Sequence, residues 1–192
     1  MIAIIKYNAG NISSVQNALT RLGYQSVITD DPETILAADK VIFPGVGEAS
    51  TAMKYLIQKK LDKIIVAIEK PILGICLGLH LMCEHSEEGD TKCLGIFNTK
   101  VKKFPQTDKV PHMGWNNFDV VGGKIFKDVS IDDDVYYVHG YYAEVNNQTV
   151  ATCNYITPFS TGMQKNNFYA TQFHPEKSAG IGEKILKNFL EL

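Results

Sequence analysis

The feature that most constrains the fold is an alternation of short apolar segments with amphipathic segments in the first half of the chain. The apolar runs are residues 2–7, 26–29, 40–47 and 71–75. Apolar residues recur at helical spacing between these runs, so the sequence predicts strands that alternate with helices. Such an order is typical of an α/β fold, and we expect a mostly parallel, doubly wound central sheet flanked by helices.

The second half of the chain has a different pattern. Residues 135–145 and several later segments are short, rich in aromatic side chains and bounded by Asn or Gly. These segments predict a mostly antiparallel strand region, and residues 118–126 predict a hairpin around Gly122 and Gly123. The chain closes with an amphipathic helix. We expect all of residues 1–192 to form one domain.

Composition excludes several classes of function. The formal net charge is −2, so electrostatics gives no reason to expect a nucleic acid or an anionic membrane as partner. The four cysteines form no C-x-x-C pair, and the histidines lack metal-ligand spacing, so we expect reduced thiols, no metal and no cofactor. There is no signal-peptide pattern and no apolar run of membrane-spanning length, which predicts a cytoplasmic protein.

A single cysteine stands between two glycines where the strand at 71–75 turns into a helix. The segment Gly74-Ile75-Cys76-Leu77-Gly78 has the G-x-nucleophile-x-G form of a nucleophile elbow. A thiol at the N-terminus of a helix is also favoured as thiolate by the helix dipole. The alternative is a buried cysteine beside a tight turn.

A nucleophile needs a base, and residues 172–178 supply a candidate. His174 ends a predicted strand, and Pro175 favours extended geometry at the residue before it. Residues two apart in an extended segment point the same way, so Glu176 could orient the His174 imidazole. A surface turn after the strand is the other interpretation.

Backbone N–H groups are also needed to stabilise an oxyanion. The N–H of Leu77 opens the elbow helix, and the glycines of the loop at 44–47 allow a peptide to turn an N–H inward. A plain strand-to-helix turn would suit the same glycines.

With these motifs in order, the sequence resembles the class I glutamine amidotransferase family. Within that family it is similar to the glutaminase subunits of imidazole glycerol phosphate synthase. The resemblance covers essentially the whole chain. It rests on the segments YNAGNISSV, FPGVG, GICLGLHLM, VPHMGWNNF, YYVHGYYAE and FYATQFHPEKSAGIG.

The resemblance implies an activity and a set of roles. Cys76 would attack the amide of L-glutamine, His174 would transfer protons, and Glu176 would orient His174. The ammonia would pass to a (β/α)₈-barrel cyclase subunit, which makes imidazole glycerol phosphate and aminoimidazole carboxamide ribotide in histidine biosynthesis. The further roles implied by the family are an oxyanion hole from Val46, Gly47 and Leu77, glutamine contacts from Gly45, His80, Gly140 and Tyr141, and partner contacts from Asn11, Met113, Trp115 and Lys177.

Two positions depart from the family pattern. His80 replaces the usual glutamine four residues after the nucleophile, and Gly140 stands where serine is common. We expect an altered glutamine affinity at a working site. Two alternatives stay open at this stage, namely the same glutaminase chemistry serving another ammonia acceptor and a scaffold subunit without catalysis.

Overall fold

The computed structural model describes residues 1–7, 10 and 12–192, and within them the largest sheet has eight strands. In sheet order these are β2 (Ser26–Thr29), β1 (Ile2–Ile5), β3 (Lys40–Phe43), β4 (Ile72–Ile75), β14 (Phe168–Thr171), β13 (Thr157–Lys165), β12 (Thr149–Tyr155) and β9 (Val120–Val121). The strands from β2 to β14 are parallel, and the remaining three continue the sheet in antiparallel fashion. The predicted fold class is therefore confirmed.

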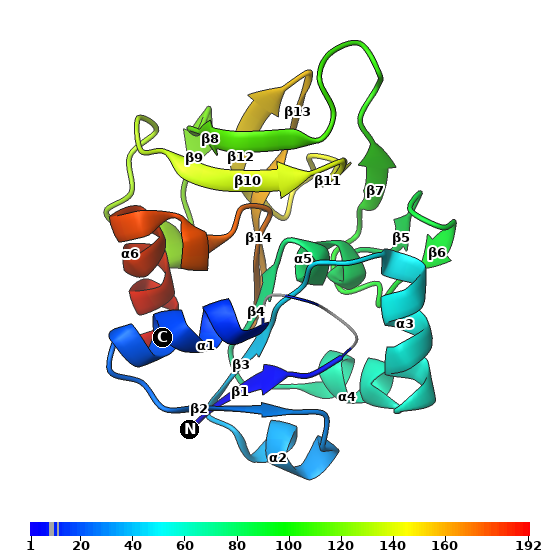
Figure 1. The fold of residues 1–192 in the computed structure, drawn as a ribbon, viewed down its shortest axis with the longest axis vertical. Coiled ribbons are helices and arrows are strands. Elements are labelled where there is room, and N and C mark those ends of the chain that lie inside the picture. Colours follow the sequence, from blue (N-terminus) through cyan, green and yellow to red (C-terminus); the bar gives the residue numbers. More distant parts are fainter. Residues whose placement is uncertain (8–9, 11) are drawn as a thin grey trace.

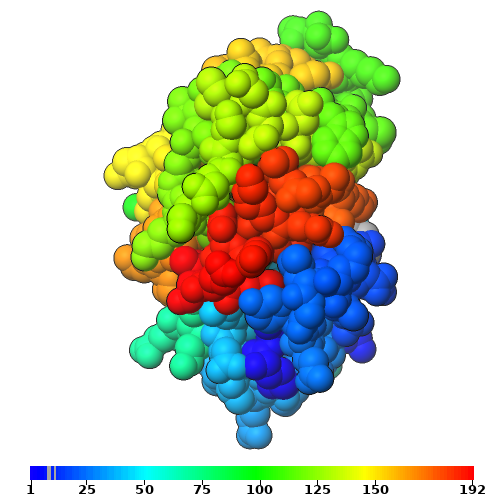
Figure 2. All heavy atoms as spheres, turned by 90° about the vertical axis from the view of Figure 1, so that its left-hand side faces the viewer, coloured from blue at the N-terminus to red at the C-terminus, as the bar shows by residue number. Residues whose placement is uncertain are grey.

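Helices cover both faces of the parallel strands (Figure 1). On one face lie α2 (Pro32–Ala37), α3 (Ala49–Gln58), α4 (Leu61–Ala67) and α5 (Leu77–Met82), and on the other lie α1 (Ile12–Arg21) and α6 (Ala179–Leu190). Helices α1 and α6 lie side by side in both views (Figures 1 and 2), joined by an ion pair of 3.3 Å between Arg21 Nε and Glu183 Oε1.

The strand residues explain this two-sided packing. In β1, Ile2 and Ile4 face the cluster beneath α1 and α6, whereas Ala3 and Ile5 face the cluster beneath the other helices. Consecutive side chains of a strand point to opposite faces, so a strand with two covered faces must be apolar throughout. The unbroken apolar runs in the sequence have this cause.

Two small sheets lie beside the carboxyl ends of the parallel strands (Figure 1). One pairs β8 (His112–Asn116) with β10 (Val135–His139). The other contains β5 (His85–Ser86), β6 (Thr91–Lys92), β7 (Lys100–Lys103) and β11 (Tyr141–Ala143). The segment 135–145 is therefore not one strand, because the chain leaves the first sheet at Gly140 and enters the second.

The hairpin predicted around Gly122 and Gly123 is wrong. Strand β9 pairs with β12, and Gly123, with φ of 85°, leads into a 3₁₀ helix over Lys124–Phe126 instead of a returning strand. Phe126 is buried there, with its ring 5.9 Å from the ring of Phe118 and 6.2 Å from that of Phe173. Core packing of this aromatic ring overrides the local turn signal.

Among the described residues, none of the helices combines the length and the apolar character needed to cross a membrane.

Candidate active site

The candidate site lies where three adjacent parallel strands end. The loop 44–47 follows β3, Cys76 follows β4, and His174 lies three residues beyond β14. Carboxyl ends of parallel strands meet at one edge of a sheet, which is the usual position of ligand sites in such folds. A cavity of about 210 Å³ opens there, lined by Val46, Gly47, Cys76, Leu77, His80, Glu88, Val138, His139, Gly140 and Tyr141.

Cys76 occupies a strained turn between β4 and α5. Its φ of 52° and ψ of −104° are unfavourable for a residue with a side chain, and its N–H donates to Thr171 O at 2.8 Å. The flanking glycines let helix and strands approach closely. A Cβ at Gly78 would lie 2.0 Å from Phe43 O, and one at Gly74 would lie 3.0 Å from the carbonyl carbon of Gly78 in the helix. The elbow therefore depends on both glycines.

His174 is bound to Glu176 by a hydrogen bond of 2.8 Å, which the Nδ1–H donates to Oε1. Both side chains are only 1% exposed. The geometry expected for them is wrong in one respect, because Pro175–Lys177 form a 3₁₀ turn rather than an extended segment. Ser178 Oγ donates to His174 O at 2.7 Å and so helps to hold the turn that brings the two side chains together.

The charge state of His174 is set by its neighbours. Burial disfavours the imidazolium, but the electrostatic effect of the Cys76 sulfur and the carboxylate of Glu176 outweigh it and raise the pKa of His174 to about 10. In the described part of the chain, Nε2 of His174 has no partner at hydrogen-bond geometry. The sulfur therefore acts on the imidazole electrostatically, and the Nε2–H remains available for transfer.

The sulfur has two other polar neighbours. The Gln172 side-chain amide donates to Cys76 Sγ at 3.7 Å, and Val138 O lies 4.0 Å from the same sulfur. Gln172 is in turn held by His80, whose Nε2–H donates to Gln172 Oε1 at 2.8 Å. Burial lowers the pKa of His80 to about 4, so this ring is neutral at pH 7. Sequence reasoning missed Gln172, although it lies two residues before His174.

The expected oxyanion donors are present but not all free. Val46 and Gly47 line the cavity, whereas the Leu77 N–H donates to Gly45 O at 3.3 Å. Gly45 itself is tightly enclosed, because a Cβ there would lie 2.1 Å from the Tyr7 hydroxyl oxygen. That hydroxyl donates to Pro44 O and holds the loop in place.

The residues expected to contact glutamine fall into two groups. Gly140 and Tyr141 line the cavity, and so does His80, although its Nε2–H is already used by Gln172. Gly45 belongs to the loop 44–47 and is not among the lining residues. A Cβ at Gly140 would meet Val110 Cγ1 at 3.8 Å, which is ordinary contact, so this position has room for a small side chain.

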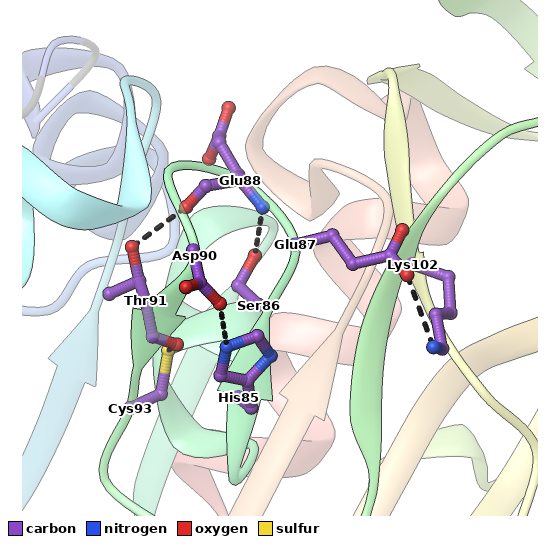
Figure 3. Close-up of polar contacts among 8 residues, drawn as sticks. All are labelled: His85, Ser86, Glu87, Glu88, Asp90, Thr91, Cys93 and Lys102. Atoms are coloured by element: carbon purple, nitrogen blue, oxygen red, sulfur yellow. Dashed lines mark hydrogen bonds and ion pairs between the residues drawn. The ribbon is translucent and has the colours of Figure 1, made fainter.

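Glu88 is a lining residue that sequence reasoning missed. Its loop is fixed by its own polar contacts (Figure 3): the Glu88 N–H donates to Ser86 Oγ at 3.1 Å, and Thr91 Oγ1 donates to Glu88 O at 2.7 Å. One carboxylate oxygen accepts the Ala49 N–H at 2.9 Å. Burial raises the pKa of Glu88, as expected for a carboxylate in a partly enclosed cavity. No motif in the sequence marks this position, which lies in a loop.

Three of the residues expected to contact a partner lie at the surface. Met113 and Trp115 are 61% and 54% exposed on the same face of β8, and the Trp115 ring lies 5.8 Å from that of Tyr136 on β10. Lys177 is also exposed, in the turn after Glu176. Asn11 lies outside the described residues. Residues 1–7, 10 and 12–192 contain no cluster of ligating side chains suited to a metal ion.

Comparison with known proteins agrees with this geometry. The family described as "Glutamine amidotransferase class-I" matches residues 3–192. "Imidazole glycerol phosphate synthase subunit HisH" of Bacteroides fragilis (strain YCH46) is 56% identical, with 100% of this chain and 99% of the relative covered. The protein of the same name from Vibrio parahaemolyticus is 42% identical, with 100% and 98% covered.

A solved structure of a glutamine amidotransferase has the same fold, with a TM-score of 0.74 at 17% sequence identity, covering 100% of this chain and 98% of the other. The predicted resemblance is confirmed: the chain belongs to the class I glutamine amidotransferase family.

Proposed function

We propose that this chain is the glutaminase subunit of an imidazole glycerol phosphate synthase. It would hydrolyse L-glutamine to glutamate and ammonia and pass the ammonia to a (β/α)₈-barrel cyclase subunit in histidine biosynthesis. One observation supports this chemistry: a cysteine on a strained elbow lies beside a buried His174–Glu176 pair at the end of the same sheet. The assignment to this synthase is supported by full-length relatives that carry its name.

The first step would form a thioester. The Cys76 sulfur attacks the side-chain carbonyl carbon of glutamine, and the carbonyl oxygen takes up negative charge. His174, charged at rest because its pKa is raised to about 10, gives its Nε2 proton to the departing nitrogen as the C–N bond breaks. The products of this step are ammonia and a glutamyl thioester on Cys76.

The second step would release glutamate. The imidazole, now neutral, accepts a proton from water, and the resulting hydroxide attacks the thioester carbon. The C–S bond breaks, glutamate leaves and the thiolate–imidazolium pair is restored. Glu176 holds the Nδ1–H throughout, so the same ring nitrogen exchanges the proton in both steps.

The isolated chain is poorly arranged to stabilise the oxyanion that forms in both steps. The Leu77 N–H is occupied by Gly45 O. We infer that this carbonyl must turn away before Val46, Gly47 and Leu77 can act together as donors. Contact with the partner, for which Met113, Trp115 and Lys177 are exposed candidates, would supply the reason for this change.

Glutamine would be held by the part of the cavity wall that Gly140, Tyr141 and Glu88 form. Gly140 and Tyr141 can bind it through backbone groups, and Glu88 provides the negative charge that a substrate α-ammonium group requires. His80 would act indirectly, because it holds Gln172 against the sulfur. Asn11 and Gly45 stay as predictions from the family resemblance.

The test is Cys76→Ala in the complex reconstituted with the cyclase subunit. Product formation driven by glutamine should disappear, while synthesis from an added ammonium salt should persist. Cys93→Ala is the matched control, because that thiol is buried outside the active-site cavity and should leave both activities intact. Loss of both activities on Cys76→Ala would mean that the cysteine is structural, and retention of both would mean that the chain is a scaffold.

A second measurement tests the partner. Glutamate release should be slow from the isolated chain and should rise when the cyclase subunit and its nucleotide substrate are added. An equal rate with and without them would contradict this partner and leave the same chemistry serving another acceptor.

A further inference from the structure

Two buried histidines outside the reaction scheme join β8 to β10. His112 Nδ1 and His139 Nε2 are 2.9 Å apart, and the two residues are register partners in the strand pair. Their exposed fractions are 4% and 5%. They belong to the face of the strand pair opposite to Met113 and Trp115, because side chains alternate along β8.

The hydrogen bonds around this pair fix both tautomers. His139 Nδ1 lies 2.7 Å from Tyr141 O, and a carbonyl only accepts, so Nδ1 of His139 carries the proton. A neutral His139 ring therefore accepts at Nε2, and His112 must donate from its Nδ1. His112 Nε2 is left as an acceptor, and the Asn116 amide nitrogen lies 3.4 Å from it.

The surroundings keep both rings neutral. The His112 ring is stacked between those of Tyr155, 4.0 Å away, and Tyr137, 4.7 Å away. Burial lowers the pKa of His112 to about 4 and that of His139 below its ordinary value. The result is a chain of hydrogen bonds with one direction, from Asn116 through both imidazoles to Tyr141 O. Removing a member would leave a buried acceptor without a donor.

The chain of hydrogen bonds ends at Tyr141 O, next to the reacting groups. Tyr141 O lies two residues beyond His139, so the bond to it closes the turn at Gly140, where the polypeptide leaves β10 for β11. Residues 138–141 form one wall of the cavity. Near the start of β10, Tyr136 O accepts a hydrogen bond from the backbone N–H of His174 at 3.0 Å. The position of β10 and of this turn therefore sets the shape of the cavity.

We propose that His112 and His139 are a positioning pair, whose directional hydrogen bonds fix the turn at Gly140 and hold the glutamine-binding wall in register with β8. This proposal rests on the proposed function, because the ligand of that wall is taken to be glutamine. Since Met113 and Trp115 lie on the other face of the same strand, the pair also ties the wall to the strand expected to contact the cyclase.

The first test separates positioning from folding in the reconstituted complex. His112→Phe keeps an aromatic ring between the two tyrosines but removes the donor, whereas His112→Asn keeps a donor near the position of Nδ1. Tyr155→Phe is the control, because it keeps the stacked ring and removes only the hydroxyl that donates to Lys109 O. Active sites are counted by covalent labelling of Cys76 with a glutamine-analogue electrophile.

A misplaced wall should raise KM for glutamine about tenfold in His112→Phe, with kcat per labelled site within about twofold of wild type. His112→Asn should recover most of the affinity, and Tyr155→Phe should behave as wild type. A purely structural role would instead lower the number of labelled sites at unchanged KM. An unchanged KM in His112→Phe, or the same rise in all three variants, would overturn the proposal.

The second test uses wild-type protein and does not depend on a variant that folds. Nitrogen-15 NMR of the imidazoles at pH 7 should show His112 and His139 both neutral and both protonated at Nδ1. Protonation at Nε2 of either ring would overturn the proposed chain of hydrogen bonds. A wild-type complex that hydrolyses no glutamine would refute the proposed function, whereas the tautomers test the pair independently of that function.

Discussion

The histidine of the candidate active site and the histidine pair between β8 and β10 are equally buried but differ in charge. His174 is 1% exposed and its pKa is raised to about 10, whereas His112 is 4% exposed and its pKa is lowered to about 4. The difference lies in their partners. His174 has a carboxylate on Nδ1 and a sulfur near Nε2, while His112 has an imidazole, an amide and two aromatic rings.

This comparison shows that burial alone does not determine what a histidine can do. Removal from water disfavours the imidazolium at both places, and only a nearby negative charge reverses that effect. The charged ring can donate a proton to a leaving group. The neutral rings of the pair have their nitrogens engaged in hydrogen bonds, so they hold neighbouring groups in place in the wall of the site.

The largest expected effect comes from removing the carboxylate that distinguishes the two places. Glu176→Gln leaves a side chain of similar size but no charge, so the His174 imidazolium should lose part of its stabilisation and the fixed orientation that the carboxylate gives to the ring. We expect the glutamine-driven rate of the reconstituted complex to fall by about 10²–10⁴-fold. The rate with added ammonium should be unchanged, and a loss of less than tenfold in the glutamine-driven rate would show that Glu176 does not orient or charge His174.

A second carboxylate, Glu88, tests the same comparison, because it places a charge in the cavity whereas the histidine pair between β8 and β10 is neutral. Glu88→Gln should raise KM for glutamine roughly 10–100-fold, because one charge-assisted hydrogen bond to the substrate ammonium group is lost. Steady-state kinetics of the complex measures this effect. Exposed Glu87 in the same loop is the matched control, and an equal change in Glu87→Gln would point to a general loss of loop structure.

The two kinds of histidine should also make opposite contributions to stability as pH changes. His80, like His112, has a folded-state pKa of about 4, below its ordinary value of 6.5, so its contribution is present above pH 6.5 and is lost as pH falls. For His174 the folded-state pKa is the higher one, so its contribution is lost as pH rises from 6.5 towards 10.

The loss of stability at low pH that comes from His80 can be measured with His80→Gln. Between pH 7 and pH 5, wild type should lose about 2 kcal/mol more unfolding free energy than the variant, which no longer has this titrating group. Chemical denaturation at the two pH values gives the difference. Equal losses in the two proteins would mean that His80 is not held neutral in the folded chain.

The smallest effect is expected at a histidine that belongs to neither place. His85 Nε2 lies 2.8 Å from Asp90 Oδ1, whose side chain is 97% exposed (Figure 3). His85→Ala should therefore change the unfolding free energy by less than about 1 kcal/mol, because water competes for a hydrogen bond to an exposed partner. A larger loss in thermal or chemical unfolding would mean that this loop contributes more to stability than its exposure indicates.

Sequence reasoning predicted the features that depend on neighbouring residues. The elbow follows from Gly74 and Gly78, where a Cβ would meet helix α5 and the neighbouring strand β3, respectively. The parallel sheet follows from unbroken apolar runs, since both faces of each strand are covered. Cys76, His174 and Glu176 were singled out by motif, and the fold brings the segments that carry them to one edge of the sheet.

The features that sequence reasoning missed depend on contacts between distant segments. Glu88 lines the cavity from a loop that carries no motif for such a role. Gln172 lies in the segment that carries His174, but its contact with the Cys76 sulfur depends on how β4 and β14 pack side by side. The occupation of the Leu77 N–H by Gly45 O depends on how two loops meet. The hairpin at Gly122 and Gly123 does not form because packing of Phe126 takes precedence over local turn preference.

The most direct test of the account is the protonation state of His174 at pH 8, measured by nitrogen-15 NMR in wild type and in Cys76→Ala. An ordinary histidine, with a pKa near 6.5, is neutral at this pH. We predict that the wild-type ring carries protons on both nitrogens, and that the proton on Nε2 is lost from most molecules when the sulfur is removed. A neutral His174 in wild type, or a charge that does not respond to Cys76, would contradict the claim that these two residues form the reacting pair.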